Sequence, residues 1–354
     1  MTKLVRICVA AFFYYTGLVK LARWWMQRSG RSLIIVAYHR ANEGDLRSHL
    51  LYLRRNYRIL HLEEALEELY APPCKRKRGM DQRTPLVLTF DDGYYDNYTH
   101  GFPLACELKI PMTIFLIPGY IENGEYFWWL ESERLVHQAK VDKIELEDCL
   151  YHLNRAKERE TLIEVINSHL RDASSVKERE EFLAIVRKKL DVPSTVAPKE
   201  ETARPLTWEE VHKMEESGWI SFGGHTMHHP ILGYLSNPEE VRREVSECRR
   251  VLEEQLGHRI RTFAYPVGKP EHIGKVALEV VHEACYDWAV TTTGGICTPK
   301  DNPLQLPRVM CEVNRPWLVT AAQISGVWYF FSPLWRWTKT LPWRKRRIAW
   351  RWMN

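Results

Sequence analysis

Short apolar runs of β-forming residues recur along this chain and alternate with helical segments. A strand that leads into a helix and then into another strand is the βαβ unit from which parallel sheets and barrels are built. The pattern therefore predicts an α/β protein, a distorted (β/α)7-type barrel. About seven candidate strands support it, at residues 33–38, 86–90, 112–117, 219–222, 261–265, 288–292 and 304–309.

Residues 129–205 interrupt this alternation. They are rich in Glu, Lys, Arg and Leu and have little β character. Apolar residues at helical spacing predict amphipathic helices over residues 150–170 and 176–190. We interpret the segment as a helical insertion within one catalytic domain that spans residues 31–316.

Both ends of the chain combine basic residues with tryptophan. In the N-terminal segment, residues 1–30, the apolar stretch 7–19 is too short for an ordinary transmembrane helix. A helix in the membrane interface and a helix packed on the protein are equal alternatives here, and a signal anchor is a third. For the tail, residues 317–354, we favour an anionic membrane surface over nucleic acid, because tryptophan prefers that interface and no nucleic-acid motif is present.

Composition bears on the compartment. The eight cysteines occur singly, with no Cys-x-x-Cys pair, which favours buried reduced thiols over a zinc knuckle. A net charge of +5 is mild for 354 residues and is concentrated in basic clusters, among them residues 75–78. We therefore predict a protein that associates with a membrane through both termini, with the cytoplasmic face favoured.

Two polar motifs follow candidate strands. Thr-Phe-Asp-Asp-Gly occupies residues 89–93, and His-Thr-Met-His-His-Pro occupies residues 225–230. The carboxyl ends of parallel strands meet on one rim, so both motifs are expected there. His225 and His229 are four residues apart and can grip one ion, and two histidines with one carboxylate suit Zn²⁺ or another divalent transition metal.

The adjacent carboxylates can divide the chemistry. One of them, Asp91 or Asp92, ligates the metal, and the other acts as general base toward a metal-activated water. Taken singly, Asp-Asp-Gly is often a solvated turn, and a His-x-x-x-His pair is common by chance. Their joint occurrence at two strand ends favours a catalytic site.

These motifs resemble those of the polysaccharide deacetylase family, also called the NodB-homology family or carbohydrate esterase family 4. The resemblance extends through residues 110–115, 264–268, 286–292 and 306–308, and covers roughly residues 33–313. It implies a distorted barrel of βα units that removes N-acetyl groups from amino-sugar glycans. By position it implies the general base Asp91, the metal ligands Asp92, His225 and His229, and the substrate or oxyanion contacts Tyr265, Val267 and Arg308.

The chain departs from the family pattern at the group that protonates the leaving amine. The family's arginine two residues before Pro266 is replaced by Ala264. Residues 306–313 lack the histidine that acts as general acid in the family. His39, which ends the first candidate strand, is the candidate substitute, weighed against a structural histidine. For Arg308, the alternative role is to anchor a carboxylate on the rim.

We therefore predict a metal-dependent hydrolase with Zn²⁺ or Co²⁺ that deacetylates an N-acetylated glycan, either an exopolysaccharide or a lipid-linked precursor. One alternative on the same scaffold is an O-acetyl esterase or a non-sugar amidase. Another is a non-catalytic glycan-binding protein, although pure binding does not need a base such as Asp91 beside a metal.

Overall fold

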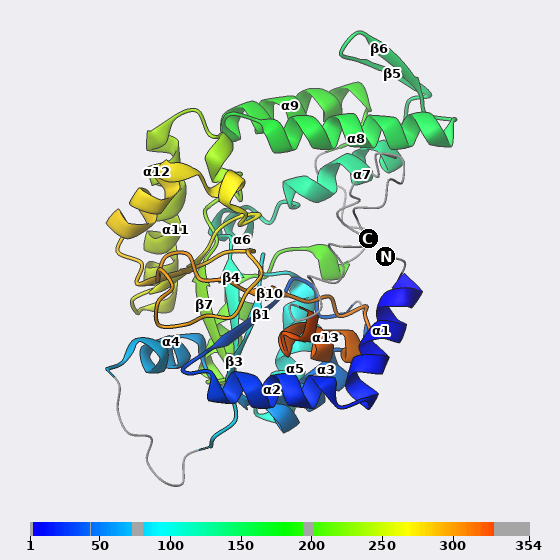
Figure 1. The fold of residues 1–354 in the computed structure, drawn as a ribbon. Coiled ribbons are helices and arrows are strands. Elements are labelled where there is room, and N and C mark those ends of the chain that lie inside the picture. The colour runs from blue at the N-terminus through cyan, green and yellow to red at the C-terminus, as the bar shows by residue number, and fades with distance from the viewer. Residues whose placement is uncertain (1–2, 43, 73–80, 194–200, 329–354) are drawn as a thin grey trace.

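Seven parallel strands form one curled sheet in the order β10-β1-β3-β4-β7-β8-β9, with the short β2 (Arg58–Ile59) paired to β3. The computed structural model describes residues 3–42, 44–72, 81–193 and 201–328 (Figure 1). The strands are β1 (Ile34–Tyr38), β3 (Pro85–Phe90), β4 (Met112–Leu116), β7 (Ile220–Gly224), β8 (Thr262–Ala264), β9 (Trp288–Val290) and β10 (Val309–Met310). The predicted α/β class and distorted barrel are thereby confirmed.

The barrel is incomplete between its two edge strands. β9 and β10 are not neighbours in the sheet order, and only an isolated bridge joins Val290 to Leu306. The seventh candidate strand was predicted over residues 304–309, but β10 comprises only Val309 and Met310. Because this last strand is so short, the sheet does not close and remains a curled half-barrel.

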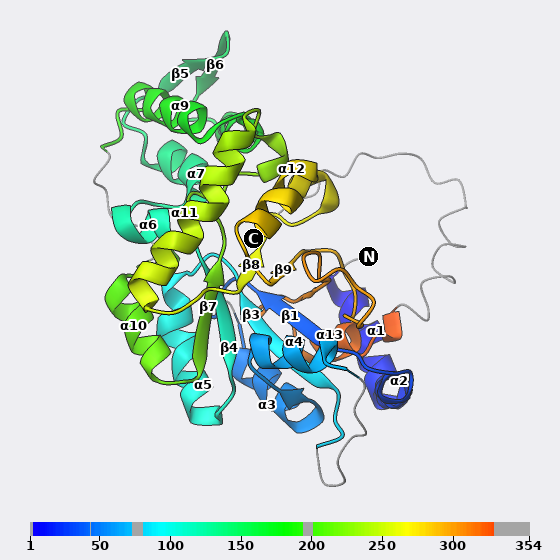
Figure 2. The same ribbon diagram turned by 90° about the vertical axis from the view of Figure 1, so that its left-hand side faces the viewer.

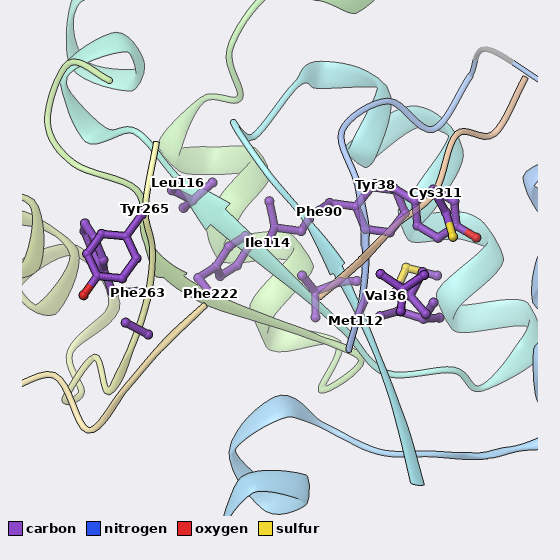
Figure 3. Packing of buried hydrophobic residues seen from close by; sticks show 14 of the residues in the cluster. Val36, Tyr38, Phe90, Met112, Ile114, Leu116, Phe222, Phe263, Tyr265 and Cys311 are labelled. Carbon is purple, nitrogen blue, oxygen red and sulfur yellow. The ribbon is translucent and has the colours of Figure 1, made fainter. Parts of the chain in front are cut away.

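Apolar side chains fill both faces of the central strands. β1 and β4 are buried along their whole length, as expected for parallel strands covered by helices. Figure 3 shows Phe90, Ile114 and Phe222, from β3, β4 and β7, in the main core. The surrounding helices (Figure 2) are α3 (Leu46–Asn56), α4 (Leu62–Tyr70), α5 (Phe102–Leu108), α6 (Pro118–Asn123), α10 (Trp208–Glu216), α11 (Pro238–Leu256), α12 (Pro270–Glu283) and α13 (Trp317–Ile324).

The insertion is mainly helical, with α7 (Trp128–Gln138), α8 (Ala156–Asp172) and α9 (Val176–Lys189). The expectation of little β structure there is wrong at one place, because β5 (Lys143–Leu146) and β6 (Cys149–His152) form a hairpin that projects beyond α8 and α9 (Figure 1). The insertion has its own apolar core, which also includes Tyr94 and Ile117 of the barrel. It is therefore packed onto the barrel.

The N-terminal segment forms two helices, α1 (Lys3–Tyr15) and α2 (Leu18–Arg28), which are separated at Gly17 by its positive φ of 81°. Ala10 and Phe13 pack with Val319 and Ala322 at α13. Among the described helices, none is long and apolar enough to cross a membrane by itself. The α1–α2 pair, bent by 68°, passes such a test only jointly and only on length and composition. The basic cluster at residues 75–78 and most of the tail lie outside the described residues, and the predicted domain boundaries stay predictions.

Candidate metal centre

The two motifs meet at the carboxyl ends of neighbouring parts of the sheet. Asp92 follows β3, and His225 follows β7. All three predicted ligands are buried, and one ligand atom of each lies within 4.8 Å of the others. Asp92 Oδ1 is 3.4 Å from His225 Nε2 and 3.6 Å from His229 Nε2. The structure thus brings together the three residues that the sequence nominated as metal ligands.

A hydrogen bond orients the His225 ring, and burial sets the protonation state of His229. His225 Nδ1 lies 2.6 Å from the carbonyl oxygen of Ala264, so Nδ1 carries the proton and Nε2 keeps its lone pair toward Asp92. Burial, followed by the charge of His225, lowers the pKa of His229 to about 3, so this imidazole is neutral. Metal binding requires the neutral imidazole.

Asp92 supplies the anionic ligand. Burial by itself raises the pKa of its carboxyl, but the neighbouring His225, together with the charges of His229 and His39, outweighs burial and lowers it. Asp92 Oδ1 is buried and has no hydrogen-bond partner in the described part of the chain. Buried polar atoms are rarely left unsatisfied, and a cation held here would supply the partner that this oxygen lacks. Two imidazoles and a carboxylate fit Zn²⁺ or another divalent transition metal.

Left-handed backbone conformations are concentrated at this rim. Non-glycine residues with positive φ include Asp92 (72°), Thr226 (66°), His229 (53°) and Val267 (58°). Each such residue costs on the order of 1–3 kcal/mol, and they persist mainly where the site requires them. The turn between the two histidines is closed by the backbone N–H of His229, which donates to Thr226 Oγ1 over 3.0 Å.

Asp91 is paired with Arg308, which is fully buried. The guanidinium donates to both carboxylate oxygens over 2.7 Å, and also to Thr89 Oγ1 and to the carbonyl of Thr291. Burial by itself raises the pKa of Asp91, but the charge and hydrogen bonds of Arg308 outweigh it and hold that pKa well below its usual range. Asp91 is therefore an ionised carboxylate, as a general base must be.

This arrangement supplies the guanidinium that the sequence lacks at Ala264. It also leaves Arg308 no exposed surface with which to touch a substrate, so the expected substrate contact does not fit. Tyr265 does not fit either, because its ring is buried against Phe263 and its hydroxyl donates to the carbonyl of Leu304 (Figure 3). Val267 remains the candidate on this loop, since within the described residues its backbone N–H has no hydrogen-bond partner.

His39 follows β1 on the same rim. Its ring is exposed, and its charge lowers the pKa values of Asp91, Asp92 and His229, so it lies near all three. Its carbonyl accepts a hydrogen bond from Asn97 Nδ2 over 3.1 Å, which holds the backbone while the ring stays accessible. The placement is that of a side chain open to the site and not of a histidine tied into the core.

The sequence analysis missed the aromatic residues that the insertion contributes. Trp128 Nε1 donates to the carbonyl of His229 over 3.0 Å. The ring of Trp129 is 4.5 Å from the ring of His229, stacks on Phe127 and donates through Nε1 to the hydroxyl of Tyr94. The run of four consecutive aromatic residues at 126–129 was the available signal. The insertion therefore forms one wall of the metal centre.

A second missed contact comes from α11. Glu244 is buried, and its two carboxylate oxygens contact the backbone N–H of His228 over 2.9 Å and the ring Nδ1 of His228 over 2.7 Å. Its own carbonyl accepts from the N–H of Met227. Glu244 thus braces the turn between His225 and His229 from beneath.

Comparison with known proteins agrees with this geometry. Residues 172–287, which include both histidine ligands, match the family described as polysaccharide deacetylase. A search among curated proteins found no match to the chain.

Several solved structures share the fold. One is the Streptococcus pyogenes deacetylase PplD in complex with acetate, with 19% identity and a TM-score of 0.53 over 83% of this chain and 98% of that one. IcaB from Ammonifex degensii has 19% identity and a TM-score of 0.54 over 84% and 98%. The putative polysaccharide deacetylase BA0330 from Bacillus anthracis has 16% identity and a TM-score of 0.51 over 83% and 69%. At these identities the likeness establishes the fold.

Proposed function

We propose that this chain, whose residues 172–287 match the polysaccharide deacetylase family, hydrolyses the N-acetyl amide of an amino-sugar glycan, either an exopolysaccharide or a lipid-linked precursor. The observation that carries this proposal is the buried group Asp92, His225 and His229 next to a carboxylate, Asp91, which Arg308 keeps ionised. Zn²⁺ is the proposed metal, and Co²⁺ fits the same ligands.

Each side chain has a distinct task in amide hydrolysis. A divalent ion at the three ligands supplies Lewis acidity toward water and toward the acetyl carbonyl. Asp91 accepts the proton that the attacking water loses, and the backbone N–H of Val267 stabilises the negative charge that develops on the acetyl oxygen. The sugar amine is a poor leaving group, and His39 donates the proton that it needs. The products are a free amine on the sugar and acetate.

Acetate release from a panel of N-acetylated and O-acetylated glycans, with and without chelator, tests the proposal. We expect release from the N-acetylated glycans alone, its loss with chelator, and its recovery with Zn²⁺ or Co²⁺. Asp91→Asn should lower kcat about 100-fold or more with unchanged metal content, because a positioned base contributes that much. Asp172→Asn, an exposed carboxylate on α8, is the matched control and should be neutral.

Each remaining outcome points to a different function. Release from O-acetylated glycans alone assigns the site to an esterase. A metal-loaded protein that releases no acetate from any substrate is a glycan-binding protein. Full activity in Asp91→Asn contradicts the assignment of the base.

The proposed role of His39 as general acid can be tested by comparing two substrates. An amide needs a proton on its leaving amine, whereas an activated aryl acetate does not. His39→Asn should therefore lower the rate on the glycan amide far more than the rate on the aryl acetate. Equal losses on both substrates remove His39 from the acid role.

A further inference from the structure

The two N-terminal helices expose apolar side chains where a helix on a soluble domain is normally polar. α1 and α2 pack their inner stripes on the body of the molecule, beside α13 and α3 (Figure 1). Their outer stripes recur at helical spacing and are still apolar. The large hydrophobic residues exposed there are Leu4, Val5, Phe12, Tyr15, Leu21, Trp24 and Trp25, each more than two-fifths exposed.

This accumulation is local. Elsewhere in the described chain only Leu51, Leu150, Ile185 and Val276 are large hydrophobic residues of comparable exposure. Single exposed residues of this kind need no explanation, whereas a contiguous apolar surface indicates a partner. Leu51 of α3 adjoins α1 and α2, since all three line one cleft.

Positive charge is also concentrated in the N-terminal segment. Residues 1–31 contain six Lys and Arg and no acidic residue. Residues 32–328 contain 37 Lys and Arg against 45 Asp and Glu, so this stretch of the sequence is net acidic. The molecule therefore has one basic, aromatic surface, on α1 and α2, and an acidic remainder. The surface that complements α1 and α2 is an apolar interface that carries anionic groups.

A cleft lined by α1, α2 and α3 has matching chemistry, and Lys20 and Arg55 at its edge are exposed. It has a volume of about 590 Å³, and its cations are Lys20, Arg23 and Arg55, while no acidic side chain lines it. Tyr15 and Trp317 add aromatic surface. Such a cleft suits a phosphate group with an attached acyl or alkyl chain.

The C-terminal end of the described chain lies at the same place. Trp328 packs edge-on against Phe13 of α1, with ring centroids 5.2 Å apart. The sequence that follows, residues 329–354, contains seven Lys and Arg, five Trp and no acidic residue. Both basic, tryptophan-rich ends of the chain thus begin at one surface.

We propose that the outer face of α1 and α2 docks on an anionic phospholipid bilayer. The helices lie in the interface plane, with Trp24, Trp25 and Phe12 at the acyl boundary, and Lys20 and Arg55 contact lipid phosphates. This surface is separate from the metal centre, and the inference does not depend on the deacetylase activity.

Flotation of the purified full chain with vesicles tests the proposal. Phosphatidylcholine vesicles with and without phosphatidylglycerol provide the neutral and anionic surfaces. We expect binding to the anionic vesicles, at least tenfold weaker binding to the neutral ones, and weakening as salt is raised, because exposed charges are screened.

Two double variants separate the apolar and the charged contributions. Trp24→Ser with Trp25→Ser, and Lys20→Glu with Arg55→Glu, should each weaken binding at least tenfold, since one cation near an anionic surface contributes about 1 kcal/mol. Leu150→Ser with Ile185→Ser removes two comparably exposed hydrophobic residues from the insertion and should leave binding unchanged. Acetate release from a soluble substrate should be unaffected in all three.

Three results overturn the proposal. One is wild-type vesicle binding in both surface variants, which moves the contact elsewhere on the chain. The second is absence of vesicle binding in the wild-type chain. The third is a wild-type dimer that becomes monomeric with Trp24→Ser and Trp25→Ser, because the face then joins two copies of the chain.

Discussion

Asp91 is a fully buried carboxylate, and it stays ionised because a fully buried guanidinium lies beside it. Burying a charge is costly unless a partner of opposite charge compensates it. Arg308 provides that compensation through two parallel hydrogen bonds, a geometry that also fixes the orientation of the carboxylate. The base is thus held in place and in charge state by one residue.

Arg308→Met tests this coupling. In the wild type the folded pKa of Asp91 lies below its unfolded value. Its stabilising contribution is therefore present above the unfolded pKa and is lost as pH falls through the folded pKa. Without Arg308, burial raises the pKa of Asp91, so the acidic limb of kcat/KM should move to higher pH, and stability should fall by about 3–5 kcal/mol. A pH–rate profile and urea unfolding measure both effects.

A matched control exists at the start of β8. Arg261 pairs with Asp287, but both side chains are partly exposed. Arg261→Met should cost about 1 kcal/mol or less and leave the pH–rate profile unchanged, because solvent screens surface pairs. An unshifted acidic limb in Arg308→Met would remove Arg308 from control of the base.

At the residue scale, the candidate metal ligands were predictable because they lie in short local motifs. The residues that support them were not, because they lie far away in the sequence. The sequence placed Asp92 at a strand end and His225 and His229 four residues apart, which is short-range information. Arg308 and Asp91 are separated by 217 positions, and no periodicity in either neighbourhood indicates that they pair. The side chain of Tyr265 was misjudged because strand-end position does not specify which face of the chain a ring occupies.

At the scale of elements, α11 supports the histidine turn through Glu244. Partners that orient metal ligands commonly change metal affinity 10- to 100-fold when they are removed. Glu244→Gln keeps the side-chain shape but weakens the contacts to His228, so metal affinity should fall about tenfold with the fold intact. Competition with a chromogenic chelator measures it. Glu247→Gln, an exposed change on the same helix, should have no effect on affinity.

The insertion places Trp129 against His229, at the edge of the metal centre. Trp129 is partly exposed, so its indole offers a flat apolar face to a sugar ring. Trp129→Ala should raise KM for the glycan severalfold and change the rate on a small aryl acetate much less, because the small substrate has no sugar ring to stack on the indole. Trp219→Ala, at the opposite end of the barrel where β7 begins, is the aromatic control. Equal losses on both substrates would mean that Trp129 only supports the site.

Elements with strong periodicity were predictable, and elements defined by unusual turns were not. The apolar runs predicted six of the seven barrel strands to within two residues at each end, but misplaced β10. Thr207 with Glu210 forms the capping box that begins α10. The hairpin β5–β6 was not predicted, because its turn residues, Glu147 and Asp148, both adopt positive φ without the glycine that normally signals such a turn.

At the scale of the molecule, the curled sheet brings together residues from distant parts of the chain. Asp92 precedes the insertion and His225 follows it, so a metal bound by both would join two segments that are neighbours only in the folded sheet. In the unfolded chain these ligands are far apart and bind weakly. A metal ion at this centre should therefore stabilise the whole fold, and not only order a loop.

Thermal unfolding of the metal-free protein with added Zn²⁺ measures this coupling. A ligand that binds only the folded state at 100 times its Kd adds about 2.7 kcal/mol, which raises the Tm of a domain this large by about 4 °C. Asp92→Asn should abolish most of that shift, since it removes the anionic ligand, whereas Asp172→Asn should retain it. The metal-free variants should unfold near the metal-free wild type, because the orphaned Oδ1 of Asp92 contributes no hydrogen bond. A shift of equal size in Asp92→Asn would place the stabilising ion at a different site on the protein.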